Sequence, residues 1–532
     1  MRFGSGSVPW RGPAAAAGGS GPAPTVARPA CRSVGRAAAP PAALVAPGLV
    51  ALLAFGGAGA AHGQTPSPSF ALTGHIEDFT LATPGDPLGA ATLTLRGIPV
   101  LLPRSLLVTM PGRYMTAQDL FRGPQGGAVQ PRSGLALADP TPPRLPFEAE
   151  AVGNAIGGQY VAGVVRISQG ALHLGAGFIQ AIDPANGELR IGAPGGTAGA
   201  RVRLNDPTGL YGMANGDGAK AAIPLDERFA LDPDNSPVHA RTGFPVCIPR
   251  PAPSALCPAG NRPAGVLRFT CSRAAPGQPG GLTPAAAPDA PAHACDPERP
   301  VPLAVGDHVT YAGMLQADPA GGFLIAAHGL EAELGIYTSP GTEPVYLFVE
   351  EAIQGTKGEP FANIPQEETT RFRIVGFTTD PSRNVEVRLI DSDRNEVGTS
   401  FTGPAGLPPS NGPQLGRFRN TWPAKDDARA VRRDVLVRVV GSPNAGLATG
   451  LTSGLYTAPI NEYISPEPTR FGVPGFPVAV PFENFCFLAQ GGGSFAAAAG
   501  SVSLGRLIPF PESGHALSQP VGNGTQRACD GQ

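Results

Sequence analysis

The chain has 532 residues, and its 73 Gly and 62 Pro together make up about a quarter of it, which is twice the usual share of roughly 12%. Gly and Pro cost about 1 and 3 kcal/mol at a helix-interior site relative to Ala, so a predominantly helical protein is excluded. A wholly disordered chain does not fit either, because 42% of the residues are hydrophobic and the formal net charge is only −2. Short strands joined by many turns remain.

Residues 1–63 have the pattern of a secretory signal peptide. Five arginines and no acidic residue come before an apolar run, Ala42–Phe55, which small residues follow. A proline and a glycine interrupt the run, which is also shorter than the roughly 20 residues that span a bilayer. Cleavage near Gln64 is therefore favoured over a membrane anchor. An over-extended gene start is an alternative explanation for the long basic region.

Cleavage predicts a secreted, periplasmic or cell-surface protein without a transmembrane span. It removes five of the 39 basic residues and leaves 34 against 41 acidic ones, a net charge of −7. This mildly acidic balance offers no electrostatic footprint for nucleic acid. The expected partner is a protein or an envelope component.

Six cysteines remain after Cys31 leaves with the signal peptide. An even number is typical of an exported, oxidised protein, and six cysteines allow 15 pairings. Pairing between sequence neighbours predicts the disulfides Cys247–Cys257, Cys271–Cys295 and Cys486–Cys529. The alternative is six unpaired cysteines that act as small hydrophobic residues.

Three stretches share a hairpin pattern. Gly177–Ile191 and Gly313–Ala326 both have a Gly, apolar residues and a Gln before an Asp-Pro-Ala turn and an apolar strand. Pro presets φ in such turns, and Gly supplies a positive φ. A third stretch, Gly74–Leu95, keeps the opening Gly, an Ile and an acidic residue. The pattern predicts an all-β protein with tandem small antiparallel β-barrels that resemble OB-like modules.

A different module begins near Thr370. Between residues 370 and 442, apolar and polar residues alternate through Val385, Val387 and Leu389, after an Asp-Pro turn. This period of two predicts a hairpin half-buried in a sandwich. The segment resembles a bacterial Ig-like β-sandwich, without the inter-sheet Cys pair of antibody domains.

The expected organisation has five parts. They are a signal peptide at 1–63, an N-terminal β module at 64–140, β-barrel repeats at 141–369, the Ig-like sandwich at 370–442 and an extended C-terminal segment at 443–532. A Pro/Cys-rich insertion at 241–302 is expected to be a long loop stapled by two disulfides. The C-terminal segment is expected to pack across the other modules through its phenylalanines, with Cys486 as an anchor.

Local motifs for catalysis and cofactor binding are missing. The three lysines, Lys220, Lys357 and Lys425, do not follow a P-loop pattern. The sequence has no G-x-S-x-G, H-E-x-x-H, C-x-x-C or G-x-G-x-x-G. We therefore expect no catalytic, cofactor-binding or metal-binding residues and no cofactor.

The histidines are scattered singly, whereas a metal site needs three or four ligands that converge. His75 and His308 stand at predicted strand starts close to Glu77 and Asp307. Pairing with a nearby carboxylate is favoured over a role as ligand or catalytic base. The other histidines that remain after cleavage are His173, His239, His293, His328 and His515.

Two acidic clusters suggest calcium. The first, Asp391, Asp393 and Asn395, has the spacing with which an EF-hand loop begins, but a Glu stands where that loop needs Gly. An exposed hairpin turn is the favoured interpretation. The second cluster is Asp232, Asp234 and Asn235, for which an Asx turn is favoured.

A glycosidase needs two carboxylates that face each other across the substrate. Glu350 and Glu351 are adjacent on a predicted strand, so they are expected to point to opposite faces and not to work together. Sugar binding has little support, because one tryptophan, Trp422, remains after cleavage. Core packing is expected for the tyrosines that remain as sugar platforms, which are Tyr337, Tyr346, Tyr456 and Tyr463.

The stretches GHIEDFTL and GDPLGAATLTL (within 74–95), RVRLNDPTGLYG (201–212) and TGFPVCIPR (242–250) resemble those of uncharacterised secreted β-rich proteins of bacteria and fungi. The resemblance implies a fold and brings no activity with it. We expect a non-enzymatic secreted or cell-surface β protein with a structural or binding role. The alternatives are an extracellular hydrolase whose carboxylates meet only in three dimensions, and a calcium-stabilised adhesion protein.

Overall fold

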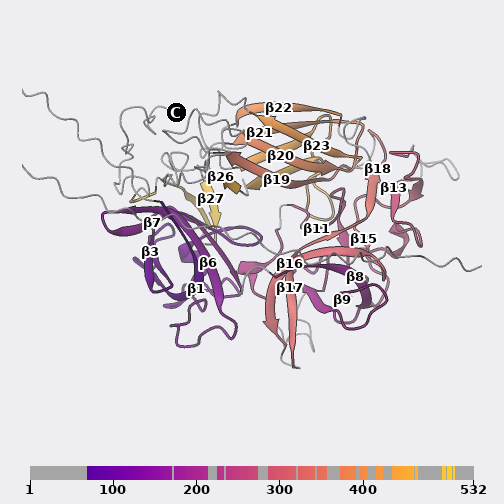
Figure 1. Cartoon of the computed structure of the whole chain (residues 1–532). Coiled ribbons are helices and arrows are strands. Elements are labelled where there is room, and N and C mark those ends of the chain that lie inside the picture. Colours follow the sequence, from indigo (N-terminus) through magenta and orange to yellow (C-terminus); the bar gives the residue numbers. More distant parts are fainter. Residues whose placement is uncertain are drawn as a thin grey trace, which may run out of the picture. The chain divides into compact units, whose positions relative to one another are not determined.

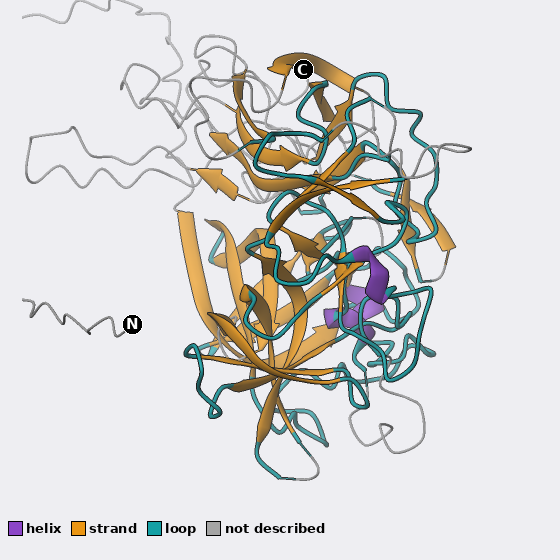
Figure 2. Ribbon diagram, turned by 90° about the vertical axis from the view of Figure 1, so that its right-hand side faces the viewer, coloured by secondary structure: helices purple, strands orange, loops and turns teal. Residues whose placement is uncertain are grey.

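The structure is a computed structural model, and strands make up most of what it describes (Figures 1 and 2). All of the described residues belong to one compact unit, His62–Gln532. They are residues 69–169, 173–213, 225–232, 235–273, 285–318, 321–341, 344–355, 372–390, 396–404, 415–422, 434–459, 462–464, 494–498, 500–505 and 507–509. No helix in these ranges is long and apolar enough to cross a membrane.

The first barrel has five strands. β1 (Ser69–Leu81) pairs with β2 (Ala91–Leu95) and β6 (Phe147–Ile156). β3 (Ile98–Leu102) pairs with β2 and, in parallel, with β7 (Gln159–Gln169), which closes the barrel on β6. Residues with apolar side chains alternate into the core along β2, as period-two strands require. This barrel therefore extends across residue 140, at which the sequence suggested a boundary.

The chain between β3 and β6 decorates the first barrel. β4 (Leu107–Thr109) pairs with β7 and with β5 (Tyr114–Thr116). A single helical turn follows, α1 (Ala117–Leu120), and the Thr116 hydroxyl caps it by accepting a hydrogen bond from the Asp119 N–H.

The second barrel has the same topology. β8 (His173–Asp183) pairs with β9 (Glu188–Gly192) and with β16 (His308–Ala317). β10 (Ala200–Leu204) pairs with β9 and, in parallel, with β17 (Phe323–Ala332), which closes on β16. β11 (Val238–Ala240) extends β17 in parallel. The OB-like all-β prediction is confirmed, and the hairpins at 177–191 and 313–326 belong to this one barrel.

Both barrels have a β-bulge at the same place in their first strand. Glu77 is the extra residue of β1, and Gln180 is the extra residue of β8. Each side chain accepts a hydrogen bond from a backbone N–H in the turn between strands two and three, Gly97 at 2.7 Å and Gly199 at 2.9 Å. The acidic or amide residue of the hairpin pattern therefore fixes this turn.

A long connection lies between β10 and β16. It contains the short 3-10 helices η2 (Glu227–Phe229) and η3 (Ala259–Asn261). Its strands β12 (Val246–Cys247) and β15 (Val301–Pro302) pair in parallel, and β13 (Arg268–Ser272) lies between β14 (Ala292–Ala294) and β18 (Gly335–Thr338). The insertion at 241–302, expected as a loop, thus forms strands, and β18 from outside it completes one of their sheets.

Two further sheets share one hydrophobic core. The first contains β19 (Leu347–Gly355), β20 (Phe372–Thr378), β23 (Arg417–Trp422) and β26 (Glu462–Ile464). The second contains β21 (Asn384–Ile390), β22 (Glu396–Pro404), β24 (Asp434–Val439) and β25 (Leu455–Pro459). Buried residues of both sheets meet in this core, among them Leu347, Ile374, Val387 and Val437. A separate hairpin joins β27 (Ser494–Ala497) and β28 (Gly500–Ser503).

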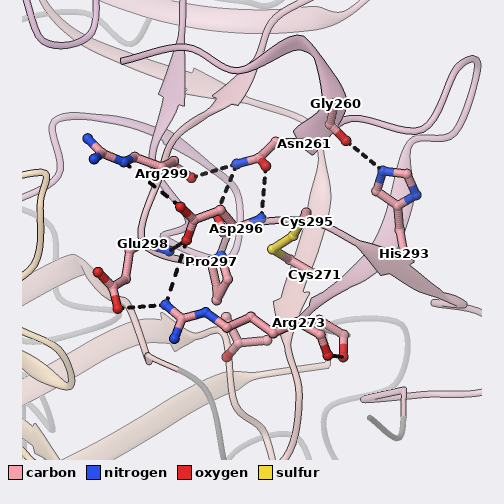
Figure 3. Close-up of a disulfide and its surroundings, with 12 residues drawn as sticks. Gly260, Asn261, Cys271, Arg273, His293, Cys295, Asp296, Pro297, Glu298 and Arg299 are labelled. Carbon is pink, nitrogen blue, oxygen red and sulfur yellow. Dashed lines mark hydrogen bonds and ion pairs between the residues drawn. A yellow bond between two sulfur atoms is a disulfide. The ribbon is translucent and has the colours of Figure 1, made fainter. Parts of the chain in front are cut away.

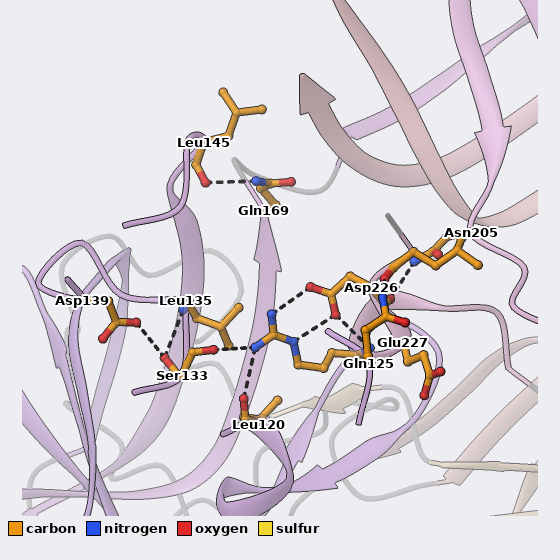
Figure 4. Close-up of polar contacts among 12 residues, drawn as sticks. Leu120, Gln125, Ser133, Leu135, Asp139, Leu145, Gln169, Asn205, Asp226 and Glu227 are labelled. Carbon is orange, nitrogen blue, oxygen red and sulfur yellow. Dashed lines mark hydrogen bonds and ion pairs between the residues drawn. The ribbon is translucent and has the colours of Figure 1, made fainter. Parts of the chain in front are cut away.

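The long connection also contributes to the first barrel's core. Phe229 is fully buried there and stacks on Phe147 with ring centroids 5.0 Å apart. Beside it the Arg228 guanidinium pairs with the Asp226 carboxylate and donates to the carbonyls of Leu120 and Ser133 at 3.1 and 2.8 Å. Figure 4 shows the Leu120 and Ser133 carbonyls and the Asp226 carboxylate around one guanidinium group, to which dashed lines join them.

Candidate functional site

A groove with a cavity volume of about 1030 Å³ lies on the stapled insertion. One wall is formed by residues 249–265 with Leu267, and the other by residues 302–307. Leu267 and Val305 are 57% and 62% exposed, so two of the most exposed large aliphatic side chains in the described ranges line the same groove. Apolar surface gathered in a concave place is typical of a ligand or partner site.

The expected disulfides Cys247–Cys257 and Cys271–Cys295 are both present. The first closes the segment that forms the longer wall, with its Cα atoms 5.8 Å apart. The third expected pair, Cys486–Cys529, lies outside the described residues. Covalent closure restricts the proline-rich wall that the sequence alone leaves as a loose loop.

An ion pair joins the two walls. The Arg262 guanidinium binds both carboxylate oxygens of Asp307 at 2.5 and 2.6 Å, and it also donates to the Pro302 carbonyl at 3.0 Å. Both side chains are nearly inaccessible to solvent. A bidentate pair of this kind is strong and directional, so it holds the walls at a fixed separation.

Asn261 ties the base of the groove to the second disulfide loop (Figure 3). Its side chain donates to the carbonyl of Asp296 at 2.9 Å and accepts from the N–H of the same residue at 2.9 Å. Asn261 is 3% exposed, so both polar ends of this amide are satisfied inside the protein. The groove is therefore preformed.

Residues 201–212 and 242–250 are joined beside this groove through Arg250, which is one of its lining residues. The buried Asp206 carboxylate accepts from the N–H groups of Gly209, Tyr211 and Gly212 and shapes the loop that they form. The Arg250 guanidinium donates to the carbonyls of Gly209 and Leu210 in that loop. These hydrogen bonds connect the loop at 209–212 to a lining residue of the groove.

The two histidines expected beside carboxylates do have carboxylate partners, one on β6 and one directly after β17. His75 lies 3.3 Å from Glu148, and His308 lies 3.3 Å from Glu333. The expected partners are engaged elsewhere, because Glu77 binds the Gly97 N–H and Asp307 binds Arg262. Asp307 and His308 are adjacent, so their side chains point in different directions, and Glu77 is displaced from the regular register beside His75 because it is the extra residue of the β1 bulge.

Two other histidines are buried in the second barrel and at its edge. Burial lowers the pKa of both His239 and His328 to about 4. The His239 ring packs on Phe348 with ring centroids 3.9 Å apart. His328 is the extra residue of a β-bulge in β17, and its Nδ1 has no hydrogen-bond partner among the described residues. His293 contacts the Gly260 carbonyl, and His515 lies outside the described residues.

The carboxylate of Glu331 on β17 feels the negative charge of Glu350 on β19. Burial raises the pKa of Glu331, and the charges of Glu350 and Glu333 raise it further while Arg241 opposes them. Glu350 is the extra residue of a bulge in β19, so the strict alternation of Glu350 and Glu351 does not hold. The expectation that these two point to opposite faces assumed a regular strand, which the bulge interrupts here.

The structure describes only some of the residues considered for calcium and sugar binding. Residues 391–395 and Asp234 lie outside the described residues, and the Asn235 side chain donates to the Asp232 carboxylate at 2.6 Å. Within the described ranges, no three His, Cys, Asp or Glu side chains are placed to hold a metal ion. Tyr337 and Tyr346 are buried, and the side chains of Trp422 and Tyr463 lie outside what the structure describes.

The sequence did not point to the groove. The available signal was the alternation of prolines in Pro249–Pro253 directly between two cysteines, in a stretch too rich in proline for strands. Pairing of β12 with β15 brings residues 302–307 opposite this segment. Comparison of the chain with family models, with curated proteins and with solved structures finds no match.

Proposed function

We propose that this is an exported, non-enzymatic β protein with a binding role, and that the groove on the insertion is its binding site. The observation that carries the proposal is the groove itself, a concave apolar surface held by a disulfide and a buried ion pair. A preformed site loses little conformational freedom when it binds. The partner is a protein or envelope component, as the mildly acidic charge balance of the chain suggests.

Cleavage of residues 1–63 and export to the periplasm, cell surface or medium belong to this proposal. Two disulfides support an oxidising compartment. The two sheets with a shared core support an Ig-like assignment for the segment around residues 370–442. N-terminal sequencing of the exported protein tests the cleavage, which predicts a start near Gln64.

The binding role is tested by capture from culture supernatant and envelope fractions with three versions of the full chain. The groove variant Leu267→Ser/Val305→Ser is compared with the wild type and with the control Leu174→Ser/Phe323→Ser, whose side chains are equally exposed on the second barrel. We expect one partner to bind the wild type and the control but not the groove variant. Capture that the groove variant retains contradicts the proposal.

A hydrolase is the second candidate, and one observation favours it. Glu331 and Glu350 interact across two strands, and Glu331 has the raised pKa that a general acid needs. A panel of ester, glycoside and peptide substrates tests this candidate. Turnover by the wild type that Glu331→Gln abolishes supports a hydrolase and overturns the non-enzymatic assignment.

A further inference from the structure

The C-terminal end of the described chain packs on the first barrel. Leu507 is 2% exposed and belongs to the core cluster of that barrel. Leu504, directly after β28, is 8% exposed and belongs to a smaller apolar cluster. The other members of this smaller cluster are Leu88, Leu107, Tyr114 and Val502. Residues from the two ends of the described chain therefore share one apolar surface.

Backbone pairing fixes the register of this contact. Arg104 and Ile508 form an isolated antiparallel bridge. The Arg104 N–H donates to the Ile508 carbonyl at 2.8 Å, and the Ile508 N–H donates to the Arg104 carbonyl at 3.2 Å. Two buried leucines and two backbone hydrogen bonds therefore hold the segment, and we call residues 502–505 and 507–508 the latch.

The surface under the latch has hydrogen bonds of its own. The Ser105 N–H donates to the Leu88 carbonyl at 2.9 Å, and the Leu88 N–H donates to the Asp86 carboxylate at 3.2 Å. The Arg104 guanidinium pairs with the same carboxylate. These bonds join the loop between β1 and β2 to the residues that follow β3, and the latch takes no part in them. The barrel therefore builds a slot of its own, formed by Leu88, Arg104, Leu107 and Tyr114.

A latch and a slot of this kind can separate while the barrel stays folded. A terminal segment with few buried contacts opens at a lower free energy than the core to which it is attached. Main-chain hydrogen bonds give affinity to an added strand segment, and pockets for its side chains give specificity. Both are present here, and the occupant of the slot is known because the structure contains it.

We propose that the latch docks reversibly in the slot of the first barrel, and that the slot recognises the latch by its backbone and its two leucines. The docked latch holds the loop at residues 82–90 and the segment at residues 103–109 in place. Undocking exposes Leu88 and Leu107, and both barrels stay folded. This device lies beyond the proposed function and does not depend on the groove.

Hydrogen exchange of the full chain, followed by mass spectrometry, tests the docking. The latch variant Leu504→Ser/Leu507→Ser is compared with the wild type and with the control Ile508→Ser, whose side chain is 41% exposed and whose backbone bonds remain. In the latch variant, exchange at residues 82–90 and 103–109 should rise by about tenfold or more. In the control, and in β8–β10 and β16–β17 of all versions, exchange should stay within about twofold of the wild type.

A synthetic peptide with the sequence of residues 500–509 tests whether the slot exists without its own latch. Added at about millimolar concentration, which is the scale of a tethered segment, it should restore the protection of residues 82–90 and 103–109 in the latch variant. A control peptide in which both leucines are replaced by serine should not restore it.

Three results overturn the inference. Exchange that the latch variant leaves unchanged shows that the slot does not need the latch. Protection that is lost and that the wild-type peptide does not restore shows that the slot does not recognise this segment. Equal loss of protection in both barrels shows that the variant has unfolded, which contradicts undocking from a folded barrel.

Discussion

The two barrels share strand order, closure and the positions of their bulges, and they differ in what joins the third strand to the fourth. In the first barrel this connection is residues 103–146, with β4, β5 and α1. In the second it is residues 205–307, which contain both disulfides and the groove. The barrel pattern thus provides a scaffold, and one connection carries the candidate function.

The barrels also differ in how their cores are completed. The first barrel's core includes Phe229, Met314, Leu324 and Ala326, which lie beyond its own strands. The second barrel's core cluster combines its own strands with residues of the connection, such as Tyr211 and Phe269, and with later residues, such as Ile336 and Tyr346. The first barrel therefore depends on the second barrel's connection through Phe229, and on its strands β16 and β17 through the other three residues.

The largest effect is expected where this dependence is concentrated. Phe229→Ala leaves a cavity in the first barrel's core, because Phe229 is fully buried, and it should lower the free energy of unfolding by about 3 to 5 kcal/mol. Urea denaturation measures the change. Phe323→Ala, at a 52% exposed position, is the control and should change stability by less than about 0.5 kcal/mol. Equal losses of stability in Phe229→Ala and Phe323→Ala would contradict the dependence of the first barrel's core on Phe229.

Acid should destabilise the second barrel and its edge more than the first. His239 and His328 have pKa values of about 4 in the fold, against about 6.5 in an unfolded chain. The unfolded state binds more protons between these values, so stability is full above pH 6.5 and falls toward pH 4, by about 3 kcal/mol per histidine.

The variant His328→Gln should reduce this pH dependence, as measured by denaturation midpoints between pH 4 and pH 7. In the first barrel the equivalent bulge residue is Gly163, which does not titrate. A slope that His328→Gln leaves intact assigns the acid sensitivity to other groups.

Loss of the first disulfide should have a slightly smaller effect. Cys247→Ser/Cys257→Ser opens a loop with a sequence separation of 10, and chain entropy predicts a loss somewhat below the roughly 3 kcal/mol of a 15-residue loop. Thermal melts of the oxidised protein measure it. The closed loop forms part of one wall of the groove. Partner capture should therefore fall even at temperatures well below the melting temperature, at which the variant is still folded.

The smallest effects are expected from substitutions of the two bulge residues, Gln180 and Glu77. Gln180 makes two bonds, to the Gly199 N–H and to the Ala193 carbonyl, and Glu77 makes one to the Gly97 N–H. Gln180→Ala should cost about 1 to 2 kcal/mol, and Glu77→Ala about 0.5 to 1 kcal/mol. A larger loss of stability in Glu77→Ala than in Gln180→Ala would show that side-chain hydrogen bonds do not stabilise the turns at Gly97 and Gly199 in the same way.

The sequence predicted the parts of the fold that depend on local pattern. Alternation in 91–95 and 385–389, the Gly and Pro turns and the spacing of Cys247 from Cys257 all led to features that the structure contains. The pairing of β1 with β6 was not predicted, because a strand's sequence does not specify a partner about 70 residues away. The bulge at Glu350 was missed for the same reason, since a bulge is a property of two paired strands.

The sequence by itself determined the class of the protein. Its glycine and proline content excludes long helices, and its hydrophobic alternation and paired cysteines require short strands and an oxidised insertion. Only the tertiary structure decided which segments meet. Arg262 faces Asp307, the proline wall faces residues 302–307, and Phe229 enters the first barrel's core. Such contacts depend on how distant segments pack, so the candidate site exists only in the folded chain.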